Sequence, residues 1–327
     1  MAAQNTFLSA VCDLCYDAIN NRRRSYAELR KIKKAERTLG FAAAMVTVLL
    51  WASAFPASRY ALAFYSPGSV MLLRFFVASV TMVIIAAAKG IKPPKLRDVP
   101  KFAAGGLVGI FSYMFFFNTG SVYVESGVSS FIIASLPVFA IILSRLLLGE
   151  RVSLIGWIGV AVSFGGLAVI TLTQVAEFEL NKGIPLLVMA AISGSIHNII
   201  QRKLLKIHTA LETTTYSIIA ATIFMLIFLP GFIRELPGST MSVNLVTAYL
   251  GVFPAALAYL SWGYALSKAE KTTHVTVFLY LVPFIAIIIA YFWLRETLSI
   301  WSFVGGIVII AGMVLTNLAR TKRGGSG

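Results

Sequence analysis

The sequence predicts an all-α, polytopic membrane protein of ten transmembrane helices, built as two inverted repeats of five helices. Hydrophobic residues make up 58% of the 327 residues and charged residues only 13%, whereas a soluble domain carries more polar surface. Apolar stretches of about 20 residues, the length that crosses a bilayer as a helix, recur along nearly the whole chain. In addition, one apolar segment occurs twice, with Pro137 and Pro283 at matching places.

Each predicted span is a long apolar run, and most connections between spans are short, so consecutive helices are expected to be antiparallel neighbours. The spans are 40–64, 67–89, 102–119, 125–147, 154–174, 184–205, 211–233, 243–266, 273–294 and 300–318. The predicted domains are a basic cytoplasmic tail, a first repeat, a second repeat and a C-terminal tail whose final GGSG is typical of an added linker. Their boundaries are 1–37, 38–176, 183–318 and 319–327.

The distribution of basic residues predicts the orientation. With the N-terminus inside, 23 of the 28 Lys and Arg residues fall on one side of the ten-span arrangement. The opposite side holds only Lys182, Arg234 and Arg295, while Arg59 and Arg74 lie within spans. Because cytoplasmic connections collect Lys and Arg, both termini are expected in the cytoplasm and the protein in the cell (inner) membrane. The net charge of +15 then needs no nucleic-acid partner.

The N-terminal tail is too polar for a signal peptide. Two interpretations of its stretch RRRSYAELRKIKK stay open: a helix lying along the anionic inner leaflet, or a disordered segment. Cys12 and Cys15 form a lone CxxC with no second pair and no nearby His, which is typical of free cytosolic thiols rather than of a zinc site.

The repeated segment reads LPVFAIILSRLLLGE at 136–150 and VPFIAIIIAYFWLRE at 282–296. From Pro137 to Gly166, ten of thirty residues are identical to those 146 positions later. Fainter matches place GIF at Gly109 over GVF at Gly251, and Arg59 over Arg202. The repeat is therefore expected to span five helices. Because five is odd, the second copy enters the membrane from the opposite side, an architecture typical of secondary transporters.

The chain also resembles a known family. LLWASAFPASRYAL, PGSVMLLRFF and SLPVFAIILSRLLLGERVSLIGWIGVAVSFGGLAVI resemble the first EamA repeat of the drug/metabolite transporter superfamily, and LVPFIAIIIAYFWLRETLSIWSFVGGIVIIAGMVL resembles the second. The resemblance covers about residues 38–318. It implies ten helices, cytoplasmic termini, a central cavity and export of small metabolites, often amino acids, with aromatic amino-acid exporters as one subgroup. The long basic N-terminal tail departs from the usual short one.

Pro137 and Pro283 lie within spans, where proline removes a backbone hydrogen bond and kinks a helix. Paired gating hinges and static packing bends are both open interpretations. Glu150 and Glu296 precede helices, and a carboxylate there complements the dipole at the helix N-terminus. We favour that structural role over proton carriage.

Small residues predict close packing between the fifth and tenth spans. They are Gly156, Gly159, Gly165, Gly166, Gly305, Gly306 and Gly312. Arg74 is a charge well within the second span and is predicted either to hold a substrate carboxylate or to be a structural pin bonded to backbone carbonyls, the role we favour. Arg59, nearer the interface, is expected to extend its charge into the headgroup region.

His197 is the most central titratable group, in a polar stretch with Asn198, Ser193 and Ser195. Polar side chains this close together are costly against lipid and are expected to face a cavity. His197 is a candidate for binding substrate or carrying a proton, and a hydrogen-bonded structural histidine is the alternative.

Mid-span aromatic residues complete the predicted substrate site, because Tyr and Trp deep in a membrane need a polar partner or water. They are Trp51, Phe55, Tyr113, Phe117, Tyr259, Trp262 and Tyr280.

The sequence favours a secondary exporter of a small, amphipathic metabolite, with the lipid bilayer and a small-molecule substrate as partners. No Walker A loop occurs, and no cofactor or metal is expected. Protons are a candidate coupling ion, and monomer and homodimer both stay open. A lipid flippase or membrane sensor on the same scaffold is the alternative. A membrane-embedded lipid-modifying enzyme is a remote one, because the acidic residues are scattered over loop ends.

Overall fold

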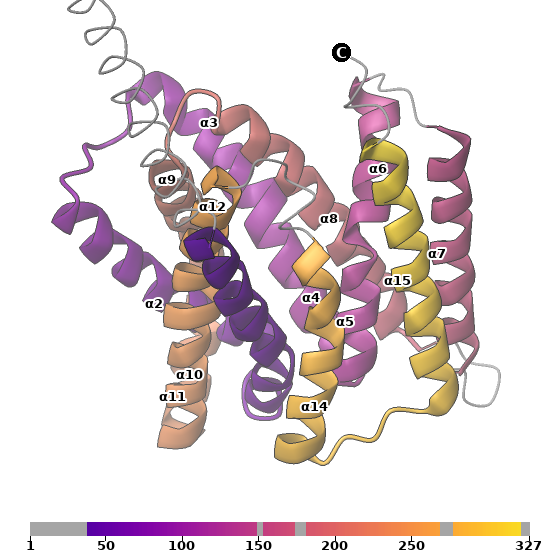
Figure 1. Cartoon of the computed structure of the whole chain (residues 1–327). Coiled ribbons are helices and arrows are strands. Elements are labelled where there is room, and N and C mark those ends of the chain that lie inside the picture. Colours follow the sequence, from indigo (N-terminus) through magenta and orange to yellow (C-terminus); the bar gives the residue numbers. More distant parts are fainter. Residues whose placement is uncertain (1–37, 149–152, 174–180, 269–276, 322–327) are drawn as a thin grey trace, which may run out of the picture.

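The computed structural model describes residues 38–148, 153–173, 181–268 and 277–321. Within these ranges the chain forms helices and no strand. Figure 1 shows the helices gathered into one bundle, with α7 and α15 side by side at one edge. The tail 1–37 with its two cysteines, Glu150, and the final linker-like residues lie outside the described residues.

The first half of the described chain contains the helix Thr38–Leu62, α2 Pro67–Ala88, η1 Leu96–Asp98, α3 Val99–Ala104, η2 Gly105–Phe111, α4 Ser112–Ser121, α5 Ser126–Ala134, α6 Leu136–Leu148 and α7 Leu154–Thr173. The second half contains α8 Gly183–Leu204, α9 Ala210–Met225, η3 Leu226–Phe228, α10 Leu229–Glu235, η4 Leu236–Gly238, α11 Met241–Leu250, η5 Gly251–Leu257, α12 Ala258–Lys268, η6 Val277–Leu281, α14 Val282–Leu294 and α15 Ile300–Thr321.

Six of these helical stretches are long and apolar enough to cross a membrane, so the chain is a multi-pass membrane protein. They are Thr38–Leu62, Pro67–Ala88, Leu96–Ser121, Gly183–Gln201, Ala210–Gly238 and Met241–Ala265. The other four predicted spans coincide with shorter apolar helices, Ser126–Ala140, Leu154–Ile170, Phe278–Leu294 and Ile300–Leu315. The number of ten membrane crossings therefore stays a prediction.

Helix boundaries recur along the chain with the spacing of the sequence repeat. The π-helical turn η2 begins at Gly105 and η5 begins 146 residues later at Gly251. In the same way α6 begins at Leu136 and α14 at Val282, and α7 at Leu154 and α15 at Ile300. Both π-helical turns interrupt a longer helix, as π-bulges do.

Both predicted hinge prolines stand at the start of a helix rather than within one. Pro137 is the second residue of α6, which follows α5 after Ser135 alone. Pro283 is the second residue of α14, which follows the 3₁₀ turn η6. The fourth predicted span is thus divided in two, because a proline ring is tolerated in a first helical turn but disrupts an interior one.

Helices α7 and α15 pack against each other along their length, and four of the predicted glycines bring their backbones together. A β-carbon on Gly166 would lie 2.5 Å from the carbonyl oxygen of Gly305, and one on Gly312 would lie 2.5 Å from that of Gly159. The later glycine of one helix meets the earlier glycine of the other, so the two helices are antiparallel. Two predicted glycines differ: nothing lies within 4 Å of the β-carbon position of Gly165, and a β-carbon on Gly306 would lie 2.4 Å from the ring of Phe131 on α5.

Hydrogen bonds from polar side chains also join helices across the apolar core, as is typical within membranes. Ser79 on α2 and Thr222 on α9 share one of 2.8 Å. Ser53 on the first helix bonds Tyr249 on α11 at 2.7 Å, and the hydroxyl of Ser163 on α7 donates to the carbonyl of Ile309 on α15 at 3.2 Å.

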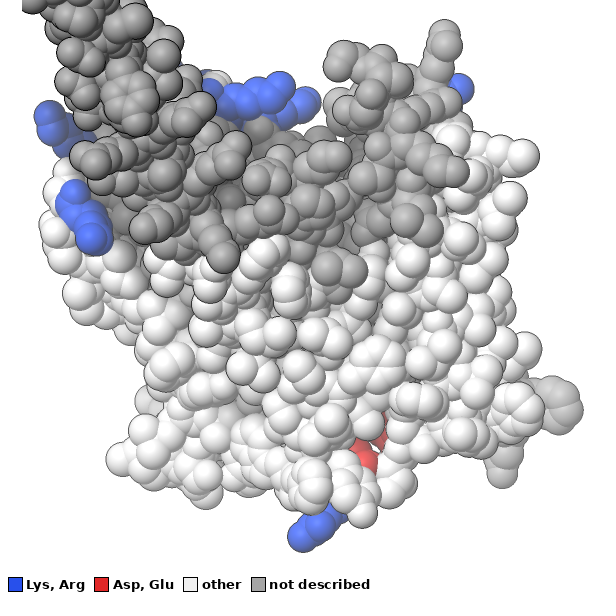
Figure 2. All heavy atoms as spheres, viewed as in Figure 1, with Lys and Arg blue, Asp and Glu red and all other residues white. Residues whose placement is uncertain are grey.

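The exposed charged side chains lie toward the two ends of the bundle. Figure 2 shows most of the basic groups toward the end where Figure 1 places the C-terminus, and acidic atoms in a recess near the opposite end, with one basic group beyond them. The sides between them are white, which is the distribution expected of a protein whose middle is surrounded by lipid.

Candidate functional site

Arg74 is the buried charge at the centre of the candidate site. It lies on α2, whose start is defined by the N-cap Ser66 and by Pro67 in the first turn, and at 1.5 Å per residue it stands about 10 Å inside the helix. The residue is 3% exposed. Its Nε and Nη1 atoms have no hydrogen-bond partner among the described residues, so the carbonyl contacts of a structural pin are missing there for both atoms.

One group of aromatic rings beside Arg74 comes from the first helix and from α12. The ring of Trp51 lies 5.5 Å from that of Tyr259 and 5.6 Å from that of Trp262. The indole nitrogen of Trp51 donates to the carbonyl of Pro254 in η5 at 3.2 Å. This bond satisfies the polar edge of the indole and fixes the ring.

A second group of rings comes from α4 and the first helix. Tyr113 stacks on Phe117 at 5.9 Å, and Phe117 meets Phe55 edge to face at 5.5 Å. The Arg74 guanidinium is close enough to Tyr113 and Tyr259 to interact electrostatically with both. We call Trp51, Phe55, Arg74, Tyr113, Phe117, Tyr259 and Trp262 the central aromatic site.

Four side chains of this site, Trp51, Tyr113, Tyr259 and Trp262, keep part of their surface accessible, while Phe55 and Phe117 are buried. Residues before and after the middle of the chain contribute to it. The arrangement offers one cation, two phenols and several ring surfaces, which suits a small molecule with an anionic group and an apolar body.

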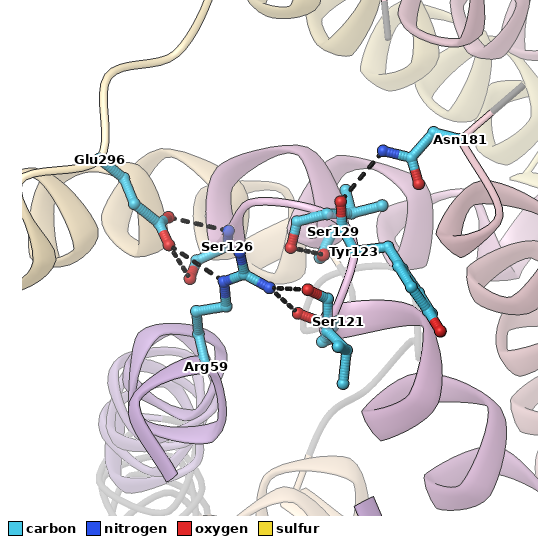
Figure 3. Close-up of polar contacts among 9 residues, drawn as sticks. Arg59, Ser121, Tyr123, Ser126, Ser129, Asn181 and Glu296 are labelled. Atoms are coloured by element: carbon cyan, nitrogen blue, oxygen red, sulfur yellow. Dashed lines mark hydrogen bonds and ion pairs between the residues drawn. The ribbon is translucent and has the colours of Figure 1, made fainter. Parts of the chain in front are cut away.

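At the end with the acidic recess, Arg59 joins segments far apart in the sequence (Figure 3). Its Nη1 donates to the carbonyls of Ser121 and Val122, where α4 ends. Its Nε lies 3.8 Å from Glu296, in the connection between α14 and α15. Arg59 therefore neutralises the carbonyl end of α4 and a carboxylate together.

Glu296 completes this network by capping α5. Its two carboxylate oxygens accept from the backbone N–H of Ser126 at 2.8 Å and from the Ser126 hydroxyl at 3.2 Å. We call Arg59, Ser121, Val122, Ser126 and Glu296 the Arg59 network. Asn181 holds the connection between α4 and α5 from its other side, because the Asn181 amide donates to the carbonyl of Tyr123 at 3.0 Å.

Two sequence interpretations are corrected here. Glu296 caps α5, not the helix that follows it, because Ser299 and Ser153 themselves cap α15 and α7 through their hydroxyls. Arg59 bonds the end of α4 rather than only extending toward the headgroups. A signal for the network was present: Arg59, Glu125 and Glu296 are all predicted near the outer ends of spans.

Glu125 stands beside this network, between α4 and α5 and outside both helices. Burial raises the pKa of its carboxyl, and the negative charge of Glu296 raises it further, while Arg59 lowers it. Glu125 thus gains a proton more readily than an ordinary exposed glutamate.

The polar residues of the sixth predicted span all lie on α8, but their surroundings differ. His197 is 9% exposed and lies against Gly109 of η2, where a β-carbon would collide with the imidazole. Its Nδ1 has no partner among the described residues. Asn198 is exposed, and the Ser195 hydroxyl donates to the carbonyls of Leu136 and Ala191.

Tyr280 lies on η6, and its hydroxyl donates to the carbonyl of Met313 on α15 at 3.4 Å. Its ring packs against the main apolar core. No group of three His, Cys, Asp or Glu residues suited to a metal occurs in the part of the chain that the structure describes.

Comparison with known proteins identifies related chains. The model of the EamA-like transporter family matches twice, at residues 38–172 and 181–318. A probable terminal-alkyne amino-acid exporter of Streptantibioticus cattleyicolor is 36% identical over 84% of this chain and 92% of its own length. The uncharacterized transporter YdfC of Bacillus subtilis is 32% identical over 84% of this chain and 89% of its own length.

The third relative is an uncharacterized transporter of Archaeoglobus fulgidus, 31% identical over 83% of this chain and 95% of its own length. A solved crystal structure with 17% sequence identity superposes with a TM-score of 0.60 and covers 88% of this chain and 97% of that one. At this identity the superposition concerns the fold alone.

Proposed function

The chain belongs to the EamA-like transporter family of the drug/metabolite transporter superfamily, and from this premise we propose that it is a secondary exporter of small metabolites such as aromatic and other amino acids. The observation that carries the proposal is the central aromatic site, where the buried Arg74, with no ion pair to a described acidic side chain, meets partly accessible rings within an apolar bundle. A buried charge is energetically costly within a membrane, and such a residue usually marks a functional site.

We propose that the ten spans form two inverted repeats, with the domain boundaries expected from the sequence. The packing of α7 on α15 supports this. Gly305 and Gly312 stand 146 residues after Gly159 and Gly166, so the contact of Gly166 with Gly305 is the counterpart of the contact of Gly159 with Gly312. Reciprocal contacts of this kind arise around a two-fold axis, and an antiparallel helix pair requires that axis to relate inverted copies.

The Arg59 network supports a mechanism of alternating access. It joins the first helix, the α4–α5 connection and the segment after α14 at one end of the bundle. In our proposal this network closes that end while the other end is open, and its release opens the site to the opposite side. Pro137 and Pro283 would serve as hinges, because each separates two helical segments.

We propose that both termini lie in the cytoplasm and that the Arg59 network faces outward. The basic end of the bundle in Figure 2 supports this orientation. A single cysteine at Gly238, where nothing lies within 4 Å of the β-carbon position, tests it in a Cys12→Ser, Cys15→Ser background. An impermeant thiol reagent should label it in intact cells and should label a cysteine at Lys206 only after lysis. The reverse pattern would overturn the orientation.

Amino acids are proposed as substrates because one relative is named an amino-acid exporter and because the central aromatic site offers both a cation and ring surfaces. Protons are proposed as the coupling ion, with His197 as the candidate carrier, since its Nδ1 is buried without a described partner. All residues of the central aromatic site come from a single chain.

The test is flux in sealed vesicles that contain only this protein. Vesicles loaded with radiolabelled amino acids should lose at least one of them faster than protein-free vesicles, and Tyr259→Ala should reduce that rate. Arg234→Met is the matched control, because Arg234 is exposed at a helix end. Lipid translocation without solute flux would instead support a flippase, and no flux of any small amphipathic metabolite would overturn the proposal.

A further inference from the structure

We propose that Arg74 anchors a substrate carboxylate, and that the site accepts organic acids with an apolar or aromatic body whether or not they carry an ammonium group. This inference rests on the proposed transport function and adds the chemical class of the substrate.

The charge of Arg74 lacks a counterion in the described protein. The described acidic side chains are Asp98, Glu125, Glu212, Glu235 and Glu296. All of them lie at helix ends, and none forms an ion pair with Arg74. Asp98 pairs with Lys101 at 2.7 Å, and Glu212 caps α9 through Thr209. Arg74 is 3% exposed, and its guanidinium lies 5.7 Å from the ring of Phe75, a cation–π contact that carries no negative charge. This favours an external anion, because a buried charge without a counterion is costly.

The donor geometry favours a carboxylate over a spherical anion. The two nitrogens without a described hydrogen-bond partner are Nε and Nη1, which lie on different edges of the planar guanidinium. Each of them forms with Nη2 a fork that matches the two oxygens of a carboxylate. Phosphate oxygens fit the same fork, but the surroundings contain rings instead of the further cations that a doubly charged group needs.

The rings define where the rest of the ligand lies. Tyr259 and Tyr113 both lie near Arg74. Tyr259 contacts the ring of Trp51, Tyr113 stacks on Phe117, and Trp51, Tyr113 and Tyr259 keep accessible surface. Aromatic faces gain most from an apolar or aromatic group. A ligand held by its carboxylate at Arg74 would therefore place its body against these rings.

An ammonium group has no comparable partner in this site. A cation close to a bound carboxylate would also lie close to Arg74, and no described acid faces it. The faces of Trp51 and Tyr259 offer only a weak cation–π attraction. An amino acid is therefore expected to bind through its carboxylate and its side chain, with little contribution from the amine.

Binding to the purified protein in detergent tests this directly, with tryptophan fluorescence as the signal because Trp51 and Trp262 belong to the site. L-Phenylalanine and 3-phenylpropionate should bind with affinities within about tenfold of each other. L-Phenylalaninamide and 2-phenylethylamine lack the carboxylate, and acetate lacks the body, so each should bind at least about tenfold more weakly. Tight binding of the amine, without binding of 3-phenylpropionate, would overturn the inference.

Variants identify the anchor. Arg74→Met should weaken 3-phenylpropionate binding at least about tenfold, and Arg74→Lys should recover part of it, because lysine keeps the charge but not the fork. Arg234→Met is the control, and size-exclusion chromatography checks folding. If Arg74→Met does not fold, Tyr113→Ala should still weaken binding of the acid more than that of acetate. Flux of non-carboxylates that survives Arg74→Met would overturn the anchor while leaving transport intact. Arg74-dependent binding without any flux would support the anchor and overturn the transport proposal.

Discussion

Replacing Glu296 by Ala tests how strongly the Arg59 network holds its end of the bundle closed. The change removes the hydrogen bond of 2.8 Å from the Ser126 N–H and the ion pair of 3.8 Å with Arg59. A hydrogen bond to a charged acceptor contributes about 1.5–3 kcal/mol. The ion pair adds at most about 1 kcal/mol because the Arg59 side chain is 32% exposed. We expect the closed arrangement to lose about 2 kcal/mol, the lower part of this range.

Amide hydrogen exchange of peptides from the α4–α5 connection measures this loss. At about 1.4 kcal/mol per tenfold, 2 kcal/mol corresponds to exchange about 30-fold faster at the start of α5. Glu235→Ala is the matched control, because Glu235 accepts from the N–H of Ser66 at 3.0 Å in the same manner. It should speed exchange at the start of α2 and leave α5 unchanged. Equal exchange of α5 in wild type and Glu296→Ala would refute the closing role of the network.

Four further predictions follow from other parts of the molecule. Gly166→Ala should lower the yield of folded protein and its thermal stability, because the new β-carbon would lie 2.5 Å from the Gly305 carbonyl oxygen. Gly165→Ala should lower neither, because nothing lies within 4 Å of its β-carbon position. Equal thermal stability of the two variants would contradict this. Pro137→Ala and Pro283→Ala should each join two helical segments and slow flux at near-normal expression, and wild-type flux in both would leave only a packing role. Glu125→Gln should remove a pH dependence of exchange in the α4–α5 connection. Since the pKa of Glu125 is raised, protection should increase in wild type as pH falls through that pKa and decrease as pH rises, and the same pH profile in both proteins would argue against it. His197→Gln should abolish the dependence of flux on pH between about 5.5 and 7.5 if His197 carries the proton, and an unchanged profile would exclude that role.

Features that belong to single segments were predictable from the sequence. The apolar runs, the basic bias and the 146-residue repeat depend on composition and order alone, and the helix boundaries follow them closely. The glycines of α7 and α15 were also recognisable, because only small residues let two backbones approach this closely. Their expected role is confirmed for Gly159, Gly166, Gly305 and Gly312. Gly165 meets nothing, and Gly306 packs against Phe131 of α5 instead.

The candidate site was predictable in its residue types but not in its grouping. Trp51, Tyr259 and Trp262 come together as rings, because the first helix lies against α12, where Thr47 also donates to the carbonyl of Ala258. His197 and Asn198 were expected to share one cavity, yet one is buried and the other exposed. Each step along a helix turns the side chain by about 100°, so neighbours in sequence need not share surroundings.

The sequence by itself determined that this chain is a multi-pass helical membrane protein with two similar halves, because hydropathy, charge bias and repetition are properties of the order of residues alone. Only the tertiary structure decided which charges have partners. Arg59 meets Glu296 and the end of α4, while Arg74, equally a charge within a predicted span, has two nitrogens without a described hydrogen-bond partner. Both are single arginines in apolar segments, and what separates them is which helix ends and acidic side chains the packing brings within a few ångströms.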